Sequence, residues 1–237
     1  MRRHPILTAL VLVALVATAC ASPGDTTGPE SSAGGSGASA PPASAAASAA
    51  PAASATPVSF KTIALKGSGD KVIKFTTPAD SAAIATFAYA GSGNFVVTSL
   101  AADGSENDLL VNTIGAYSGT VLFDAQSGEH SVALKVEATG AWTGKIQPTS
   151  AAPVWNGKTK LTGKGDEAIR VSPAASGLTV LTVAGTGQGN LVVIGYSPDG
   201  QDLIVNEIGK YTGQVQLADG SFFLTIESDG PWTISPG

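Results

Sequence analysis

The sequence has little of the side-chain chemistry on which most enzymes depend. Its 237 residues include one cysteine and two histidines, and only 13% of them are charged. A serine–histidine–aspartate site needs a histidine beside the nucleophile, and a zinc site needs several histidine or cysteine ligands. Apart from His4, the only histidine is His130, which follows Gly128 and Glu129 where a solvated turn is expected. We therefore expect no enzyme and no cofactor.

The charge balance excludes a second class of function. The formal net charge is −5, whereas a nucleic-acid interface gains most of its affinity from clustered basic side chains. The single cysteine, Cys20, also cannot form a disulfide within the chain. We expect no nucleic-acid partner, and we expect the folded part to be stabilised by packing alone.

The amino terminus has the pattern of an export signal. Residues 1–4 are basic, and residues 5–19 form an apolar run that ends in small residues. This run is shorter than the roughly 20 apolar residues that a membrane-spanning helix needs. Residues 1–19 are therefore predicted to be a signal peptide.

The last four residues of this region resemble a lipobox, the cleavage motif of bacterial lipoproteins. Ala17-Thr18-Ala19-Cys20 has small residues before a cysteine, although Ala17 replaces the more usual leucine. The resemblance implies cleavage between Ala19 and Cys20, with diacylglycerol and further acyl chains on Cys20. Two or more chains anchor a protein stably at the extracytoplasmic face of the membrane. An ordinary secretory signal with an incidental cysteine is the alternative.

Residues 20–56 are predicted to be the lipidated cysteine and a disordered tether. After Cys20 they consist almost entirely of Ser, Ala, Gly, Pro and Thr. No large apolar side chain is present whose burial would offset the entropy of ordering this backbone.

The remainder of the chain is an internal duplication, and we expect two domains at residues 57–149 and 153–237. Each motif of the first repeat returns in the second, in the same order. The matched segments are 65–70 with 161–166, 91–94 with 187–190, 108–112 with 202–206, 114–119 with 208–213, and 140–143 with 230–233. Their offset falls from 96 to 94 to 90, which places insertions in turns near residues 105 and 128.

Each repeat is predicted to be an antiparallel β-sandwich or jelly roll. Short apolar runs separated by turn residues at intervals of about 8–12 residues are typical of this fold class. In the first repeat we expect strands near 60–65, 71–76, 83–90, 94–101, 108–112, 119–123, 130–137 and 141–147. Residues 102–104 and 198–200 are expected to be hairpin turns with a glycine of positive φ. In the second repeat Phe222, Leu224 and Ile226 are expected to point inward, which makes Phe223 a candidate contact between the domains.

Two sets of residues are candidates for ligand binding. The aromatic pairs could stack on sugar rings or fill the two cores, and these residues are Tyr117, Trp142, Tyr211 and Trp232. A second set of oxygen donors could hold calcium or simply form turns: Asp103, Asp108, Asn112, Asp199, Asp202 and Asn206. Asp108 and Asp202 are also a conceivable pair of glycosidase carboxylates, but they belong to different repeats.

The G-x-Y-x-G and G-x-W-T segments of residues 57–237 resemble uncharacterised β-sandwich repeats of secreted bacterial, actinobacterial-type lipoproteins. A weaker similarity links Asp108-Leu-Leu-Val and the glycine-rich turns to prepeptidase C-terminal β-domains, although their usual Asp-x-Asp-Leu-Tyr is absent. The resemblance implies an exported binding or structural module. Its expected partner is a cell-wall polymer or glycan, with a protein adhesion or scaffold role, or an accessory role beside a secreted hydrolase, as alternatives.

Overall fold

The computed structural model describes residues 58–79 and 81–237, and all of them belong to one compact unit. The predicted signal peptide, the lipidated Cys20 and the tether lie outside these residues. Within the described ranges no helix is long and apolar enough to cross a bilayer.

The structure is all-β, as predicted from the sequence, and the first repeat consists of two four-stranded sheets. One sheet has the order β1-β8-β3-β6 and the other β2-β7-β4-β5. The strands of the first sheet are β1 (Ile63–Ser68), β8 (Ala141–Pro148), β3 (Ala83–Tyr89) and β6 (Tyr117–Phe123). Those of the second are β2 (Lys71–Lys74), β7 (Ala133–Ala138), β4 (Asn94–Leu100) and β5 (Glu106–Ile114).

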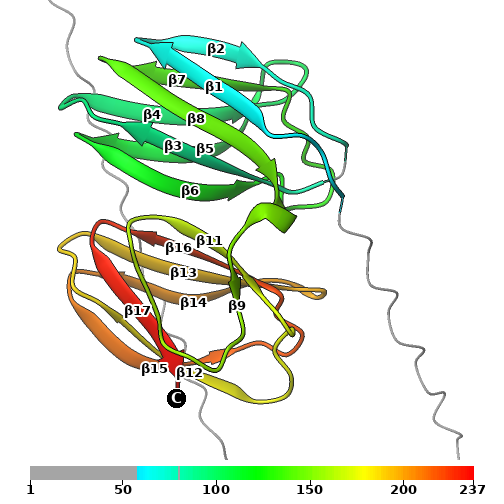
Figure 1. Cartoon of the computed structure of the whole chain (residues 1–237), viewed down its shortest axis with the longest axis vertical. Coiled ribbons are helices and arrows are strands. Elements are labelled where there is room, and N and C mark those ends of the chain that lie inside the picture. Colours follow the sequence, from blue (N-terminus) through cyan, green and yellow to red (C-terminus); the bar gives the residue numbers. More distant parts are fainter. Residues whose placement is uncertain (1–57, 80) are drawn as a thin grey trace, which may run out of the picture. The chain divides into compact units, whose positions relative to one another are not determined.

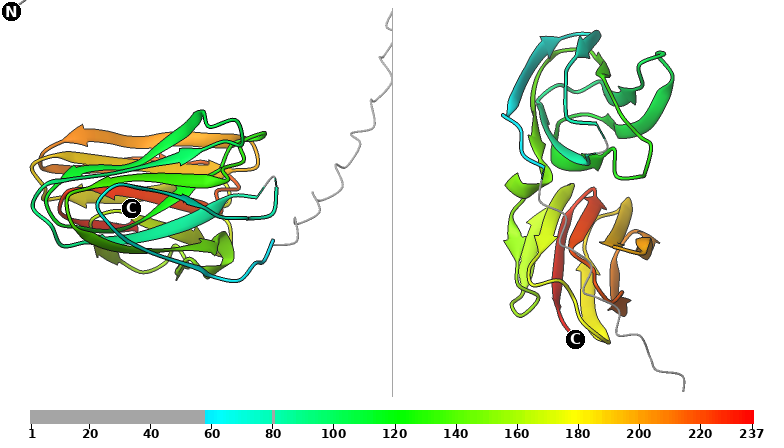
Figure 2. Two further views of the ribbon diagram at one scale, coloured as in Figure 1. Left: turned by 90° about the horizontal axis from the view of Figure 1, so that it is seen from above. Right: turned by 90° about the vertical axis from the view of Figure 1, so that its right-hand side faces the viewer.

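The second repeat has the same arrangement with one strand added. Its sheets have the orders β10-β17-β12-β15 and β14-β13-β16-β11-β9. The first contains β10 (Leu161–Lys164), β17 (Pro231–Pro236), β12 (Thr179–Gly185) and β15 (Tyr211–Leu217). The second contains β14 (Gly200–Ile208), β13 (Asn190–Ser197), β16 (Phe223–Ser228), β11 (Glu167–Val171) and β9 (Val154–Trp155). A short 3₁₀ turn, η1 (Thr149–Ala151), connects the repeats (Figure 1 and the right-hand view of Figure 2).

Strand β9 departs from the predicted purely antiparallel fold. It pairs in parallel with β11, and Trp155 on this strand is buried in the second core. The Trp155 indole nitrogen donates to the carbonyl of Thr159 at 2.8 Å. The position that corresponds to Trp155 in the first repeat is Ser59, so this strand and its tryptophan were not visible in the repeat pattern.

Corresponding pairs of strands have the same register in both repeats, except that β4–β5 has a second irregularity between Ser99 and Leu100. The β4–β5 and β13–β14 pairs each contain a β-bulge, between Val97 and Thr98 in one and between Val193 and Ile194 in the other. The hairpin turns between these strands contain Gly104 at φ +87° and Gly200 at φ +125°, which confirms the turns predicted at 102–104 and 198–200. The duplication in the sequence is therefore a duplication of backbone geometry.

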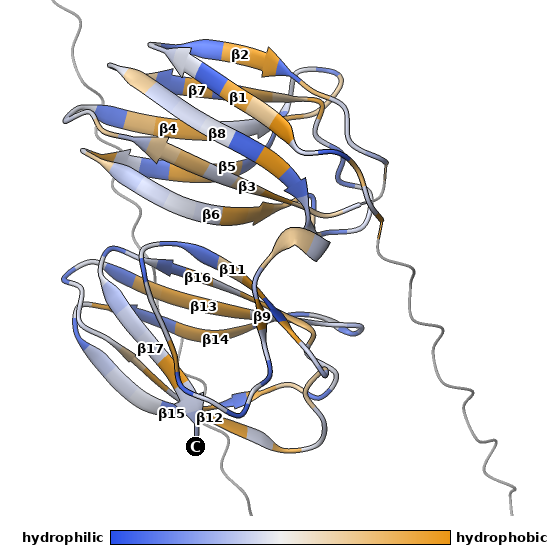
Figure 3. Ribbon diagram, in the orientation of Figure 1, coloured by the Kyte–Doolittle hydropathy of each residue, from blue (hydrophilic) through white to orange (hydrophobic). Residues whose placement is uncertain are grey.

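Each repeat encloses its own apolar core between its two sheets. Alternation of apolar and polar residues, visible along β1 and β8 in Figure 3, turns one set of side chains inward. The first core includes Phe87, Phe95, Phe123, Leu134, Val136 and Ile146, and the second includes Ile169, Leu181, Leu191, Leu224, Ile226 and Ile234.

The prediction that the Phe222 side chain points into the core is wrong. Leu224 and Ile226 are buried as expected, but the side chain of Phe222 is 47% exposed. Phe222 precedes the first residue of β16, so its side chain lies at the margin of the sandwich rather than between the sheets.

Candidate functional site: a groove between the repeats

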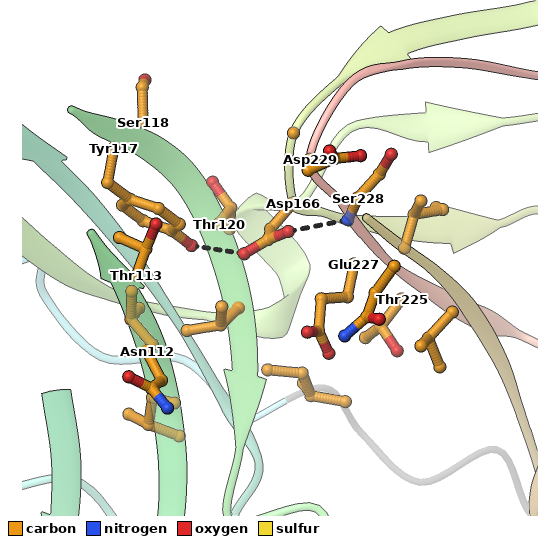
Figure 4. Close-up of a pocket in the computed structure, with 18 of the residues that line it drawn as sticks. Asn112, Thr113, Tyr117, Ser118, Thr120, Asp166, Thr225, Glu227, Ser228 and Asp229 are labelled. Carbon is orange, nitrogen blue, oxygen red and sulfur yellow. Dashed lines mark hydrogen bonds between the residues drawn. The ribbon is translucent and has the colours of Figure 1, made fainter. Parts of the chain in front are cut away.

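A polar contact joins the two repeats at Asp166. The Tyr117 hydroxyl of β6 donates to Asp166 Oδ2 at 2.7 Å, and the Ser228 amide of β16 donates to Asp166 Oδ1 at 2.9 Å (Figure 4). The Thr120 amide also donates to the carbonyl oxygen of Asp166 at 2.8 Å. One aspartate therefore binds strands of both repeats.

The backbones approach closely at this contact, and two glycines make that approach feasible. A Cβ atom on Gly119 would lie 3.0 Å from Asp166 Cβ, and one on Gly165 would lie 3.1 Å from the carbonyl oxygen of Ser118. A side chain at either position would require the neighbouring atoms to shift by a few tenths of an ångström. Gly165 also has a φ of +75°, which other residues adopt at a cost.

An apolar cluster lies beside the polar contact. Its buried members come from both repeats and from the connector: Ile84, Ala152, Ala168 and Phe223, with Leu122 and Tyr196 packed against them. The rings of Tyr196 and Phe223 meet edge to face at 6.3 Å. Phe223 thus contacts the other repeat, as its outward position predicted.

Next to these contacts lies a groove of about 1260 Å³. The first repeat contributes β5 and β6, and the second contributes β13, β16 and the turn before β11. Most of its polar groups are amides, hydroxyls and carboxylates, from Asn112, Thr113, Ser118, Thr120, Asn190, Thr225, Glu227 and Asp229 (Figure 4). Its apolar lining includes Leu109, Ile114, Val192 and Ile194.

Carboxyl groups along the groove hold their protons more tightly than usual. Burial raises the pKa of Asp166, against the hydrogen bonds from Tyr117 and Ser228. Burial also raises the pKa of Glu227, with repulsion from Asp166 adding to the rise and a hydrogen bond from Asn190 opposing it. Burial, followed by the charge of Asp166, raises the pKa of Tyr117, so its hydroxyl stays protonated and donates.

The predicted aromatic candidates do not form one site. Trp142 and Trp232 are buried in the two cores, and their indole nitrogens donate to the carbonyls of Gly69 at 3.1 Å and Gly165 at 2.9 Å. Neither ring is open to a sugar, so the ligand-binding prediction for these two tryptophans is wrong and the core interpretation accounts for them.

The two tyrosines have different surroundings although their motifs match. Tyr117 is half-buried, lines the groove and is bonded to Asp166. Tyr211 is half-buried at the equivalent position on β15 and does not line the groove. Of the four aromatic candidates, only Tyr117 is part of the groove.

The oxygen donors proposed for calcium are not brought together. Asp108 and Asn112 lie four residues apart on β5, and Asp202 and Asn206 on β14, a separation of about 13 Å along an extended strand. No cluster of three or more acidic, histidine or cysteine side chains suited to a metal occurs in residues 58–79 and 81–237. The calcium alternative therefore gains no support from the positions of these donors.

The turn interpretation describes Asp103 well. The amide and hydroxyl of Ser105 donate to Asp103 Oδ1 at 2.9 and 2.7 Å, and these bonds lower the pKa of Asp103. At residue 199 the backbone amide rather than the carboxylate makes a local bond, by donating to the Ser197 hydroxyl at 3.2 Å. Asp108 and Asn112 line the groove, whereas Asp202 and Asn206 do not.

His130 lies outside the groove lining. It is half-buried rather than fully solvated, and its Nδ1 atom has no hydrogen-bond partner within the described residues. The turn in front of it is held instead by Asp124, whose carboxylate accepts from the Ser131 amide at 2.9 Å and from the Ser131 hydroxyl at 2.6 Å.

Sequence reasoning missed Asp166, Asn190 and Glu227, which complete the groove. Asp166 ends one of the repeated motifs and Asn190 ends another, so their recurrence was visible. The role of Asp166 and Asn190 in the groove could not be seen in the sequence, because it depends on which residues of the other repeat lie opposite them. Glu227 also recurs, as Glu137 three residues before the matched 140–143 segment, but its place in the groove follows only from the register of β16.

Comparisons with known proteins add no assignment. No protein-family model and no curated protein matches the sequence. Among solved structures, the chain is similar to the guanosine-bound regulatory subunit of a cAMP-independent protein kinase A from Trypanosoma cruzi, with 9% identity and a TM-score of 0.22. That likeness covers 71% of this chain and 72% of the other. The stem and receptor-binding domain of spike protein P1 from bacteriophage PM2 has 11% identity and a TM-score of 0.16, with 76% and 80% covered. Neither likeness is close enough to carry an argument about function.

Proposed function

We propose that this chain is a lipid-anchored extracytoplasmic protein whose two repeats form one non-catalytic binding module for a cell-wall polymer or another glycan. The lipobox-like segment ending at Cys20 supports the membrane address, and the composition of residues 21–56 supports a tether. The observation that carries the binding role is the groove between the repeats.

The lining of the groove suits a hydroxyl-rich ligand. Asn112 and Asn190 each offer an amide donor and acceptor, and Glu227 and Asp229 offer carboxylate acceptors. Amides and carboxylates can form hydrogen bonds with the many hydroxyls of a sugar, and the ligand does not need to carry a charge for this. The hydroxyls of Thr113, Thr120 and Thr225 add further donors and acceptors along the same lining.

The structure changes the reasoning about multivalency. The duplication by itself would allow two similar sites, one in each repeat. Asn112 and Asn190 belong to different repeats, and their counterparts Asn206 and Asn94 do not line the groove. We therefore propose one composite site that neither repeat forms alone.

The test is binding of dilute protein to purified cell wall and to a glycan array. The variant Asn112→Ala/Asn190→Ala removes an amide from each wall of the groove. The matched control Asn94→Ala/Asn206→Ala removes the same amides from the equivalent positions of the other repeat. Groove variants should lose at least about tenfold in affinity while the control keeps it. Equal binding by both double variants would refute the groove as the site.

A protein partner is the second candidate, and exposed apolar residues favour it. Leu109 and Ile114 on β5 are largely exposed at the groove, and β5 is the last strand of its sheet. An extended peptide could pair with such an edge. Binding that requires Leu109 and Ile114, but neither asparagine, would favour this alternative.

A further inference from the structure

The contact between the repeats joins two different surfaces. The first repeat contributes an edge surface, made of Ile84, Tyr117, Gly119 and Leu122. The second contributes a face surface, made of Gly165, Asp166, Ala168, Tyr196 and Phe223. Because the contact is heterologous, each repeat keeps one surface unused. The register of the strands identifies the unused counterparts as Val180, Tyr211, Gly213 and Gln216 on the second repeat, and Gly69, Asp70, Val72, Leu100 and Ala133 on the first.

The polar half of the contact is retained on both unused surfaces. Asp70 Oδ1 accepts from the Ala138 amide at 2.9 Å, as Asp166 Oδ1 does from the Ser228 amide. Within residues 58–79 and 81–237, neither Asp70 Oδ2 nor the Tyr211 hydroxyl makes a hydrogen bond of the kind that joins Asp166 to Tyr117. Gly213 and Gly69 match the two glycines that permit close approach. The donor, the acceptor and the space for a second Tyr–Asp contact are therefore present.

The apolar half is retained at two positions and left uncovered. Ile84 is 3% exposed inside the contact, while its counterpart Val180 is 37% exposed. Ala168 is 1% exposed, while its counterpart Val72 is 62% exposed. Two valines at positions that the internal contact buries are thus open to solvent.

The charges around the unused surfaces differ from those at the internal contact. Inside the chain Asp108 lies near enough to Tyr196 to raise the pKa of that phenol, after burial as the main cause, and Thr225 stands beside Tyr196. The counterparts are Asp202 on the unused edge surface, and Leu100 and Lys135 on the unused face surface. Lys135 already pairs with Glu106 at 3.7 Å and with Glu137 at 3.4 Å, so the repeated contact is carried by the Tyr211–Asp70 bond and the valines rather than by this charge.

Two substitutions make the unused surfaces less apolar than the used ones. Gln216 stands in place of Leu122, and Ala133 in place of Phe223. A contact between molecules would also lack the connector that holds the repeats together within the chain. It is therefore weaker than the internal contact, which suits reversible association.

We propose that the unused edge surface of the second repeat binds the unused face surface of the first repeat of another copy of this chain. The contact repeats the internal one, with Tyr211 bonded to Asp70 and Val180 packed against Val72. Such head-to-tail contacts extend into chains or close into rings. This inference does not depend on the ligand of the groove.

The test uses residues 53–237, which lie in one compact unit, in sedimentation velocity over a concentration series. Wild type should associate with a dissociation constant of about 1 mM or tighter. Val72→Glu and Val180→Glu each place a charge on one of the two surfaces, and each alone should weaken association at least about tenfold. Val154→Glu alters an exposed valine on β9, outside both surfaces, and should leave association unchanged.

Mixing the two variants distinguishes this contact from other kinds of association. Each variant keeps the surface that the other has lost, so an equimolar mixture should form heterodimers and no larger species. Circular dichroism and unfolding curves verify that each variant is folded. A wild type that stays monomeric up to about 1 mM, single variants that assemble as wild type does, or a mixture that stays monomeric would overturn the proposal.

Discussion

At the scale of single residues, the two halves of the chain offer matched pairs whose members have different surroundings. Trp142 and Trp232 occupy the same core position, and each donates to a glycine carbonyl. Tyr117 and Tyr211 share a motif, but only Tyr117 bonds to an aspartate of the other repeat. Such pairs provide an internal control for most substitutions.

Replacing either core tryptophan should destabilise the protein strongly. Trp142→Ala and Trp232→Ala each leave a cavity in a core and an unpaired glycine carbonyl. We expect a loss of about 3–5 kcal/mol in the free energy of unfolding for each. Urea denaturation followed by circular dichroism measures this. A change below about 1 kcal/mol would contradict the burial of these rings.

Removing the Tyr117 hydroxyl should weaken the contact between the repeats. Tyr117→Phe deletes the hydrogen bond to Asp166 and leaves one carboxylate oxygen without it. A bond to a charged group contributes about 1.5–3 kcal/mol, so we expect a loss of that order. Tyr211→Phe is the control, and in dilute protein its free energy of unfolding should match that of wild type. Equal effects of both substitutions would contradict the assigned role of Tyr117.

The raised pKa values of Asp166 and Glu227 predict that mild acid stabilises the fold. A carboxyl whose pKa is higher in the folded state than in the unfolded state favours folding when protonated. This stability is fully present below the unfolded pKa, about 4 for aspartate, and is lost as pH rises through the folded pKa. The melting temperature should therefore rise as pH falls from neutral toward that value.

Asp166→Asn should flatten this dependence, because it removes one of the carboxyls whose pKa burial raises and also removes its repulsion with Glu227. Asp229→Asn, which changes an exposed carboxyl at the rim of the groove, serves as the matched comparison. Differential scanning fluorimetry across the pH range gives both curves. A wild-type melting temperature that falls in mild acid would contradict the conclusion that burial is the main cause of the raised pKa of Asp166.

At the scale of elements, alternation and turn residues were enough to predict the strands. All eight strands expected in the first repeat are present near their predicted positions, and the Gly104 and Gly200 turns are confirmed. These features depend on neighbours in the sequence. Strand β9 and the exposure of Phe222 were missed, because both depend on where a sheet ends rather than on the local pattern. The groove was missed for the same reason, since Asp166 and Tyr117 meet only through the packing of β6 on β11.

The contact between β3, β6 and the second repeat can be tested by exchanging equivalent residues. Leu122→Gln introduces the residue that the second repeat has at this position, Gln216. It replaces an apolar contact in the cluster around Phe223 by an amide, and we expect a loss of about 1–2 kcal/mol. Gln216→Leu is the reciprocal change on an exposed part of β15 and should cost little. Denaturant unfolding compares the two, and equal small effects would refute the role of Leu122.

At the scale of the whole molecule, the membrane address is a separate prediction from the fold. Cys20→Ser removes the only thiol to which a lipid could be attached. We expect the variant to leave the membrane fraction and to lose incorporation of a labelled fatty acid. Wild-type protein that is soluble and unlabelled would show that the lipobox interpretation is wrong.

The central claim is that one ligand site lies between the repeats, and hydrogen exchange with soluble cell-wall fragments tests it most directly. The claim predicts added amide protection in β5 and β13, which supply Asn112 and Asn190 to the groove. It predicts no added protection in the β14–β15 edge of the second repeat, which carries the counterparts of the first repeat's groove residues. Equal protection of β5 and β14, or protection confined to strands outside the groove, would contradict a composite site.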